Sequence, residues 1–179
     1  MTRYIFGICN VRQCIPKMIR EFVNRNHSRK LKVIDIGAGY GDKTKFFIKH
    51  GFYVLAVEPH RKLIEVIKKE VREADIIRAV VEYLPIRSNT FDVVLFWNVV
   101  MFVSDLERTI KNILDISKEG ANLFIAYYKL KNERKLANIV LNETQFIELC
   151  RKFGHIIKHG KRFRDIYHAH IKVAKYDKN

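Results

Sequence analysis

The sequence predicts an α/β protein in which helices cover both faces of an open, mainly parallel β-sheet. Two observations point to this fold class. Apolar runs of strand length alternate with stretches whose apolar residues recur at helical spacing. The runs are also rich in β-branched residues, as parallel strands buried on both faces are. With 179 residues, of which 48% are hydrophobic, the chain can form one sizeable core, so we expect a single domain, 1–179.

The first half of the chain predicts three helices and three strands. Pro16 suits the start of a helix, and the strand that follows that helix ends at Gly37. The next helix stops at Gly51, and Pro59 closes the second strand. The expected elements are, in order, helix 17–26, strand 31–36, helix 41–50, strand 53–58, helix 60–74 and strand 76–81.

The second half predicts two more helices and an antiparallel end to the sheet. Ser104 and Glu107 form a capping-box pattern, and Asn142 and Gln145 repeat its logic. In the final strand, alternation places His168 and His170 on the opposite face from Tyr167, and we expect these histidines to face solvent. The expected elements are strand 91–97, helix 105–117 ending near Gly120, strand 121–128, helix 143–153 ended by Gly154, and a hairpin of 156–160 and 166–176.

The charge of the chain is strongly positive and unevenly distributed. Thirty-four Lys and Arg residues against 19 Asp and Glu residues give a net charge of +15. Residues 1–30 contain seven basic residues and one acidic residue, residues 31–120 contain 14 and 13, and residues 121–179 contain 13 and five. Such a charge favours anionic partners, and nucleic acid is among them.

Cysteine usage and hydropathy predict a cytoplasmic protein. The three cysteines, Cys9, Cys14 and Cys150, form no CxxC pair, and we interpret them as reduced thiols. The first residues are too polar for a signal peptide, and no apolar run approaches the ~18 residues of a membrane span, so we expect no membrane association. The histidines lack a nearby carboxylate or cysteine signature, so no metal site is expected.

A glycine-rich turn follows the first strand and marks a candidate ligand site. Its pattern is D-x-G-x-G-x-G over residues 35–41, and Glu58 ends the next strand. In open α/β sheets the ligand binds beyond the carboxyl ends of the strands, where glycines permit close approach and a helix start offers free N–H groups. A dinucleotide fingerprint would need glycine at position 42, which is Asp42, and this carboxylate would repel a pyrophosphate.

Together with the E-x-L-P motif of residues 82–85 and the S-x-x-F-D motif of residues 88–92, this turn resembles the class I S-adenosylmethionine-dependent methyltransferases, and more narrowly their type 11 group. The resemblance covers 31–127 by motif. It implies a three-layer α-β-α Rossmann-like sandwich, with a seven-stranded sheet in the order 3-2-1-4-5-7-6 and an antiparallel C-terminal strand. It also implies S-adenosylmethionine as methyl donor, with S-adenosylhomocysteine as product.

The resemblance assigns roles to ten residues. Glu58 would bind both ribose hydroxyls, Asp35 would orient the turn or the amino group, and Asn98 would lie near the methionyl group and the methyl. At position 80, where related chains commonly have an acid for the adenine amine, this chain has Val80, so Glu82, a backbone carbonyl or water must meet that amine. The remaining assignments are Gly37, Ala38 and Gly39 for methionyl contacts, Pro59 beside the adenine, and Val81, Glu82 and Tyr83 along its edge.

Three segments of the domain suggest different roles and leave the acceptor open. We interpret residues 1–30 as a basic helical cap, 31–127 as the cofactor core, and 128–179 as the acceptor-side helix and hairpin. Because methyl transfer is an in-line displacement, alignment matters more than a general base, and no catalytic residue is assigned. The basic flanks and the short cap favour an RNA acceptor, such as tRNA or rRNA. The alternatives are a small metabolite or protein side chain as acceptor, and a non-catalytic module that binds an adenosyl ligand or nucleic acid.

Overall fold

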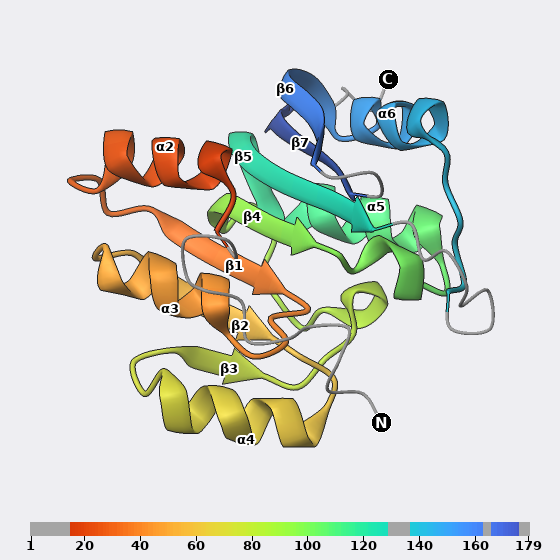
Figure 1. Cartoon of the computed structure of the whole chain (residues 1–179). Helices are drawn as coiled ribbons and strands as arrows, with labels where there is room; N and C mark the ends of the chain where they lie inside the picture. Colours follow the sequence, from red (N-terminus) through yellow and green to blue (C-terminus); the bar gives the residue numbers. More distant parts are fainter. Residues whose placement is uncertain (1–14, 129–136, 163–165, 176–179) are drawn as a thin grey trace.

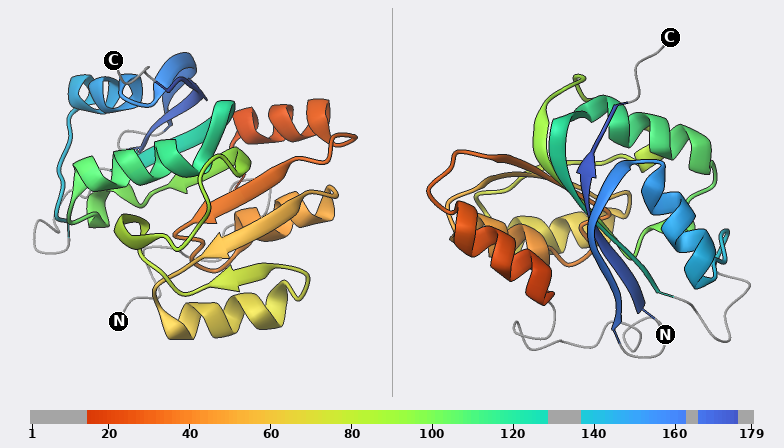
Figure 2. Two further views of the ribbon diagram at one scale, coloured as in Figure 1. Left: turned by 180° about the vertical axis from the view of Figure 1, so that it is seen from behind. Right: turned by 90° about the horizontal axis from the view of Figure 1, so that it is seen from above.

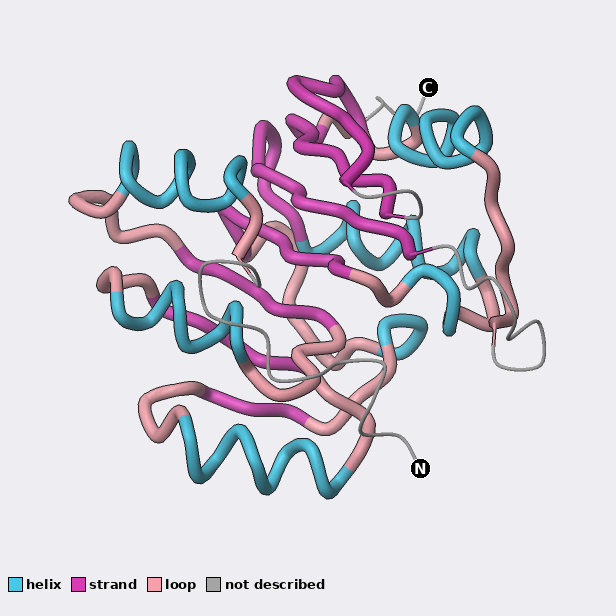
Figure 3. Tube along the Cα trace, viewed as in Figure 1, coloured by secondary structure: helices cyan, strands magenta, loops and turns pink. Residues whose placement is uncertain are grey.

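The computed structural model describes residues 15–128, 137–162 and 166–175. It contains a central sheet with helices on both faces (Figures 1 and 3). The elements are α2 Lys17–Asn26, β1 Lys32–Ile36, α3 Asp42–Lys49, β2 Tyr53–Val57, α4 Arg61–Glu70, β3 Asp75–Ile77, the 3₁₀ turn η1 Val81–Tyr83, β4 Phe91–Trp97, the 3₁₀ turn η2 Val100–Phe102, α5 Leu106–Ile116, β5 Ser117–Tyr128, α6 Glu143–Arg151, β6 Gly154–Arg162 and β7 Ile166–Val173.

The seven strands follow the order β3-β2-β1-β4-β5-β7-β6, as predicted. Strand β1 pairs in parallel with β2 and with β4, and β7 is antiparallel to both of its neighbours. In the β1 register Ile36 lies opposite Val57 on one side and Phe96 on the other. The carboxyl ends of these three strands are therefore level, so the residues that follow them meet at one edge of the sheet, which we call the cofactor edge.

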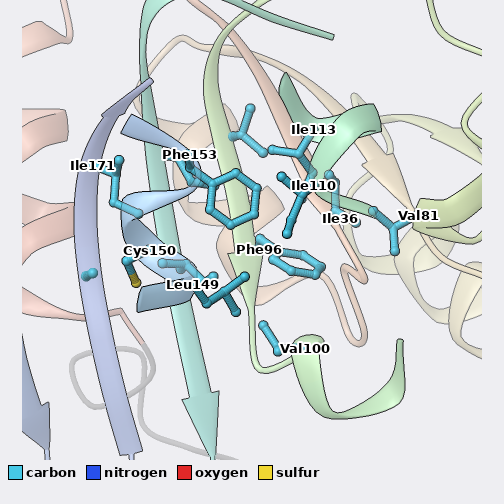
Figure 4. Packing of buried hydrophobic residues seen from close by; sticks show 14 of the residues in the cluster. Ile36, Val81, Phe96, Val100, Ile110, Ile113, Leu149, Cys150, Phe153 and Ile171 are labelled. Carbon is cyan, nitrogen blue, oxygen red and sulfur yellow. The ribbon is translucent and has the colours of Figure 1, made fainter. Parts of the chain in front are cut away.

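Each face of the sheet has its own apolar core. Helices α2 and α3 bury Ile19 and Phe47 against one face, together with Phe124 of β5. Helices α5 and α6 cover the other face, where Figure 4 shows Ile110, Ile113 and Phe153 packed around Phe96. The view from above in Figure 2 shows these helix layers on opposite sides of the sheet. The predicted three-layer α/β fold is confirmed.

Helix α5 explains two differences from the sequence prediction near β3. The strand ends at Ile77 instead of residue 81, and Val81–Tyr83 form a 3₁₀ turn. Two side chains of α5 bind this turn: Asn112 donates to the carbonyl of Val81 at 2.9 Å and Arg108 to that of Glu82 at 2.8 Å. These bonds satisfy the backbone outside the sheet, so the strand need not continue.

The predicted capping box at Ser104 and Glu107 is wrong. The N-cap of α5 is Asp105, whose side chain accepts a hydrogen bond from the N–H of Arg108. Ser104 instead donates both its N–H and its hydroxyl to the carboxylate of Glu82, at 2.8 and 2.9 Å. The helix also ends earlier than predicted, because β5 already begins at Ser117. The second capping box, formed by Asn142 and Gln145, is confirmed.

The prediction that His168 and His170 face solvent is wrong for His170. Its ring stacks on Phe124 with centroids 4.3 Å apart, and Phe22 of α2 lies 6.1 Å away. Burial, aided by the charge of Lys172, lowers the pKa of His170 to about 4. The opposite face of β7 is buried as predicted. Strand alternation is correct, but helix α2 covers the histidine face, which alternation alone does not reveal.

No helix in the described ranges is long and apolar enough to cross a membrane. Cys150 is buried and free, and burial raises the pKa of its thiol to about 12. The other two cysteines, Cys9 and Cys14, lie outside the described residues. Within the same part of the chain, no group of three or more His, Cys, Asp or Glu side chains is placed to hold a metal ion.

Candidate functional site

The glycine-rich turn after β1 directs its N–H groups into the protein. The N–H groups of Gly37 and Ala38 both donate to the carbonyl of Val57, at 2.8 and 3.0 Å, and that of Gly39 donates to Glu58 Oε2 at 2.9 Å. The three N–H groups of the turn are therefore paired within the protein, so any free N–H groups would have to come from the start of α3, as the sequence predicts. Within the described ranges the carbonyl of Gly37 accepts no hydrogen bond, so its acceptor capacity is unused.

Glu58 joins the glycine turn to the loop after β2. Only 3% of the residue is exposed. Its Oε2 accepts from Gly39, and its Oε1 accepts from the N–H of His60 at 3.0 Å. A carboxylate has about four acceptor positions, so two remain for hydroxyl donors. The structure thus places a fixed, buried carboxylate beside the turn, where the sequence analysis expects the ribose contact.

Asp35 lies beneath the turn and joins β1 to α3. The hydroxyl of Thr44, in the first turn of α3, donates to Asp35 Oδ2 at 2.7 Å. Burial raises the pKa of the Asp35 carboxyl, while Lys43 and the Thr44 hydrogen bonds act in the opposite direction. A buried carboxyl at this position keeps the turn and the helix together, and burial disfavours its charged form.

Asn98 follows β4 and has an unsatisfied side chain. Its N–H donates to the carbonyl of Ala126 at 3.0 Å, and its φ is +59°, in the left-handed region that asparagine tolerates. Its Oδ1 is buried and has no hydrogen-bond partner among the residues that the structure describes. A buried acceptor without a partner costs about 1–3 kcal/mol, so its retention points to a donor supplied by a ligand.

Gly37 and Gly39 of the turn differ in the room that an added Cβ atom would have. A Cβ atom on Gly39 would meet only the carbonyl oxygen of Gly37, at 4.0 Å. A Cβ atom on Gly37 would clash with Cγ2 of Val99. The loop after β4 is therefore packed directly on the first glycine, which brings the preceding residue, Asn98, to the same turn.

A small hollow of about 90 Å³ lies beside the turn, on the side of β2 and η1. This volume is well below the roughly 300–1,000 Å³ of a pocket that encloses a whole ligand, so the hollow suits one end of a molecule. Among the predicted site residues, Gly37, Pro59, Val81 and Glu82 line it. The other lining residues are Ile36, Val57, Ala79, Val80, Val99, Phe102 and Val103.

The predicted adenine-edge residues have partners of their own. Burial would raise the pKa of Glu82, but hydrogen bonds from the backbone and hydroxyl of Ser104 outweigh it and lower that pKa. Tyr83 is 63% exposed, and the guanidinium of Arg108 lies 4.1 Å from its ring centre. Both Ser104 hydrogen bonds go to Oε1 of Glu82, so one oxygen of this carboxylate is held by the segment just before α5.

The sequence analysis assigns no site role to four residues of this region: Val99, Phe102, Ser104 and Arg108. Each acts through a contact between segments distant in the chain, for which the sequence carries no local signal. Ser104 was noticed only as a capping residue, because serine before a helix is a common N-cap.

Comparison with known proteins supports the family suggested by the motifs. The family model described as a methyltransferase domain, of type 11, matches residues 34–125, just over half of the chain. The ubiquinone/menaquinone biosynthesis C-methyltransferase UbiE of Wigglesworthia glossinidia brevipalpis is 28% identical over 104 residues, which cover 52% of this chain and 41% of that protein. The chain therefore spans about two-fifths of the length of this curated relative.

Solved structures share the fold at low sequence identity. The PH0226 protein of Pyrococcus horikoshii aligns with a TM-score of 0.73 at 14% identity over 87% of each chain. A SAM dependent methyltransferase from Aquifex aeolicus aligns with a TM-score of 0.69 at 17% identity, over 86% of this chain and 89% of that chain.

The chain belongs to the type 11 methyltransferase domain family. This confirms the predicted family and fold class, and with them S-adenosylmethionine as the cofactor that membership implies. The residues present fit that group. Asn98 Oδ1 and the Gly37 carbonyl are acceptors suited to an ammonium group, and Asp35 and Asp42 are compatible with a ligand that has no phosphate.

Proposed function

We propose that this protein is an S-adenosylmethionine-dependent methyltransferase and that its acceptor is RNA. The observation that carries the first part is the buried, unpartnered Oδ1 of Asn98 at the cofactor edge. It lies between the glycine turn and β4, where a donor from a bound ligand would satisfy it. When bound, the cofactor supplies a methyl group already activated on a sulfonium.

The side chains at the cofactor edge have distinct proposed roles. Asn98 and the carbonyl of Gly37 accept from the ammonium group. Glu58 accepts from the two ribose hydroxyls with its remaining lone pairs. The apolar residues of the hollow, Val81 and Val103 among them, cover the adenine and exclude water. The chain thereby aligns the methyl group with an incoming nucleophile, which is the main requirement of an in-line displacement.

The RNA acceptor is supported by charge. Residues 1–30 and 121–179 carry +6 and +8, whereas residues 31–120, which contain the cofactor motifs, carry +1. Excess cations in the segments that flank a cofactor core suit a polyanionic acceptor held through its phosphates.

A small apolar molecule is a second candidate acceptor. One specific observation favours it: the curated relative UbiE is named a C-methyltransferase of ubiquinone/menaquinone biosynthesis. The exposed aromatic ring of Phe102, 50% exposed at the rim of the hollow, is compatible with an apolar acceptor.

One experiment separates these functions. The protein is incubated with methyl-tritiated S-adenosylmethionine and either bulk tRNA and rRNA or a metabolite extract, and label is followed into each pool. Label in RNA supports the proposal, label only in metabolites supports the second candidate, and calorimetric binding without any transfer would indicate a non-catalytic module.

Glu58→Ala should lower the calorimetric affinity for S-adenosylhomocysteine at least about tenfold, and unchanged affinity would refute the site.

A further inference from the structure

Within the described residues, helix α2 of the first basic flank and strand β6 of the second lie on one face of the folded protein. Helix α2 and strand β6 are about 130 residues apart in sequence, yet Glu21 and Lys158 form an ion pair at 3.8 Å. Phe22 also lies 6.1 Å from His170 of β7, which is paired to β6. Figure 2 shows α2 on the side of the sheet away from α5 and α6. We call the exposed surface formed by α2, the turn after it and β6 the α2–β6 face.

This face is rich in exposed cations and poor in acids. Glu21 is the only acidic residue among the first 30 positions, and it is shared by Lys17 at 3.7 Å and Lys158 at 3.8 Å. The two lysine side chains remain 78% and 57% exposed, so one carboxylate only partly offsets two accessible ammonium groups. Further exposed cations are Arg25, Arg29 and Lys30.

The face reaches the cofactor edge at one end. A short turn joins α2 to β1, so the helix runs back along the sheet in the direction opposite to β1 (Figure 1). Strand β6 is antiparallel to β7, and β7 is antiparallel to β5. Thus β6 runs in the direction of β5 and also ends at the cofactor edge. A long anion lying along this face would therefore extend to the proposed site of methyl transfer.

We propose that the α2–β6 face binds the phosphate backbone of the acceptor RNA, with Lys17 and Lys158 as phosphate contacts and Glu21 as an opposing charge. This inference rests on the proposed function. A membrane surface fits less well, because interfacial binding needs apolar side chains beside the cations. Among the exposed large apolar residues of the described segments, only Ile157 lies on these two elements.

The test measures binding of fluorescein-labelled bulk tRNA by anisotropy between 50 and 200 mM salt, a range over which phosphate contacts weaken strongly. Lys17→Gln with Lys158→Gln should weaken binding on the order of tenfold at the lower salt and reduce the slope of log affinity against log salt by about 1.4–1.8. Glu21→Gln should instead strengthen binding by about threefold or more, since it removes the opposing charge.

Helix α4, near the opposite end of the sheet, provides matched controls. Lys62→Gln with Lys69→Gln removes two exposed cations there, and Glu65→Gln removes the acid of an i,i+4 pair with Arg61, equivalent to Glu21 with Lys17. Neither control should change tRNA affinity by more than about twofold. Melting temperatures of all variants should agree within a few degrees, since every altered side chain is largely exposed or in a surface pair.

The outcomes distinguish the face from the function. If the α2–β6 variants match the α4 controls, or if Glu21→Gln does not strengthen binding, the inference is wrong even where RNA is methylated. If tRNA binding follows the prediction while tritium enters only metabolites, the proposed acceptor is wrong and the inference with it. Binding to phosphatidylserine-containing vesicles that depends on these two lysines, without binding to tRNA, would also overturn it.

Discussion

The side chain of Val99 occupies the space that a Cβ atom on Gly37 would need, with Cγ2 of Val99 as the nearest atom. Gly37 also has a φ of +69°, which disfavours any L side chain. The contact between Val99 and Gly37 thus fixes how the loop after β4 packs on the turn after β1. Glycine is required at position 37 both for this packing and for the backbone conformation of the turn.

Gly37→Ala should destabilise the protein by more than the roughly 1–2 kcal/mol of a left-handed alanine, because a steric clash is added. Gly51→Ala is the matched control. Its φ is +80° and nothing lies within 4 Å, so it should show the backbone cost alone. Urea unfolding of Gly37→Ala, Val99→Ala and the double variant should reveal favourable coupling of at least about 1 kcal/mol. Purely additive effects would contradict the contact.

Asp35→Asn should raise stability at neutral pH while weakening the cofactor site. Burial raises the pKa of Asp35, so the stability associated with its protonated form is present below the ordinary value of 3.8 and is lost as pH rises through the raised pKa. Asparagine does not ionise, so the variant does not lose this stability. Its melting temperature should therefore exceed that of the wild type at pH 7, and the difference should disappear near pH 3.8. Asp42→Asn, exposed in the same region, should give no such gain.

Asn98→Gly should separate binding from folding. Glycine accepts the left-handed backbone at this position and removes the unpartnered Oδ1, whose burial costs about 1–3 kcal/mol, so the unfolding free energy should not fall and should rise within that range. The affinity for S-adenosylhomocysteine should fall about tenfold, since one hydrogen bond is worth about 1 kcal/mol or somewhat more with a charged donor. Calorimetry showing equal affinity would indicate that this amide does not contact the ligand.

His170 should make the protein sensitive to acid. Its pKa is lowered from 6.5 to about 4, mainly by burial, so its contribution to stability is present above pH 6.5 and is lost as pH falls through about 4. The loss is at most about 3 kcal/mol. His170→Phe retains an aromatic ring against Phe124 and should flatten the pH dependence of the unfolding free energy across that window. The exposed His155→Gln should leave it unchanged.

The central strands could be predicted from sequence because their signals are local. Strand β4 spans Phe91–Trp97 as expected, since the apolar run there follows a polar turn at residues 87–90 and ends at Asn98. Interactions between distant segments could not be predicted. Ser104 and Asp105 are both good N-caps, and the choice between them follows from Glu82, which accepts the N–H and hydroxyl of Ser104. The short β3 likewise follows from hydrogen bonds supplied by α5.

In the candidate site, too, the sequence predicts local features but not the contacts that form on folding. The sequence locates the glycine turn, Glu58 and Asn98 correctly at one edge of the sheet, because parallel strands deliver their ends together. It does not reveal that the N–H groups of Gly37 and Ala38 donate to Val57, or that Asn98 Oδ1 lacks a partner. Those facts depend on the direction of each group after folding.

The two hydrogen bonds that hold Glu58 have a consequence for ligand recognition. Immobilising a glutamate side chain costs about 1.5–2 kcal/mol of conformational entropy, and here folding has already met that cost. A sugar entering the site therefore finds a stationary acceptor, and a larger share of each new hydrogen bond appears as affinity. The same two bonds shape the turn, so a chain that loses this carboxylate loses the rigidity of its ligand site together with the contact itself.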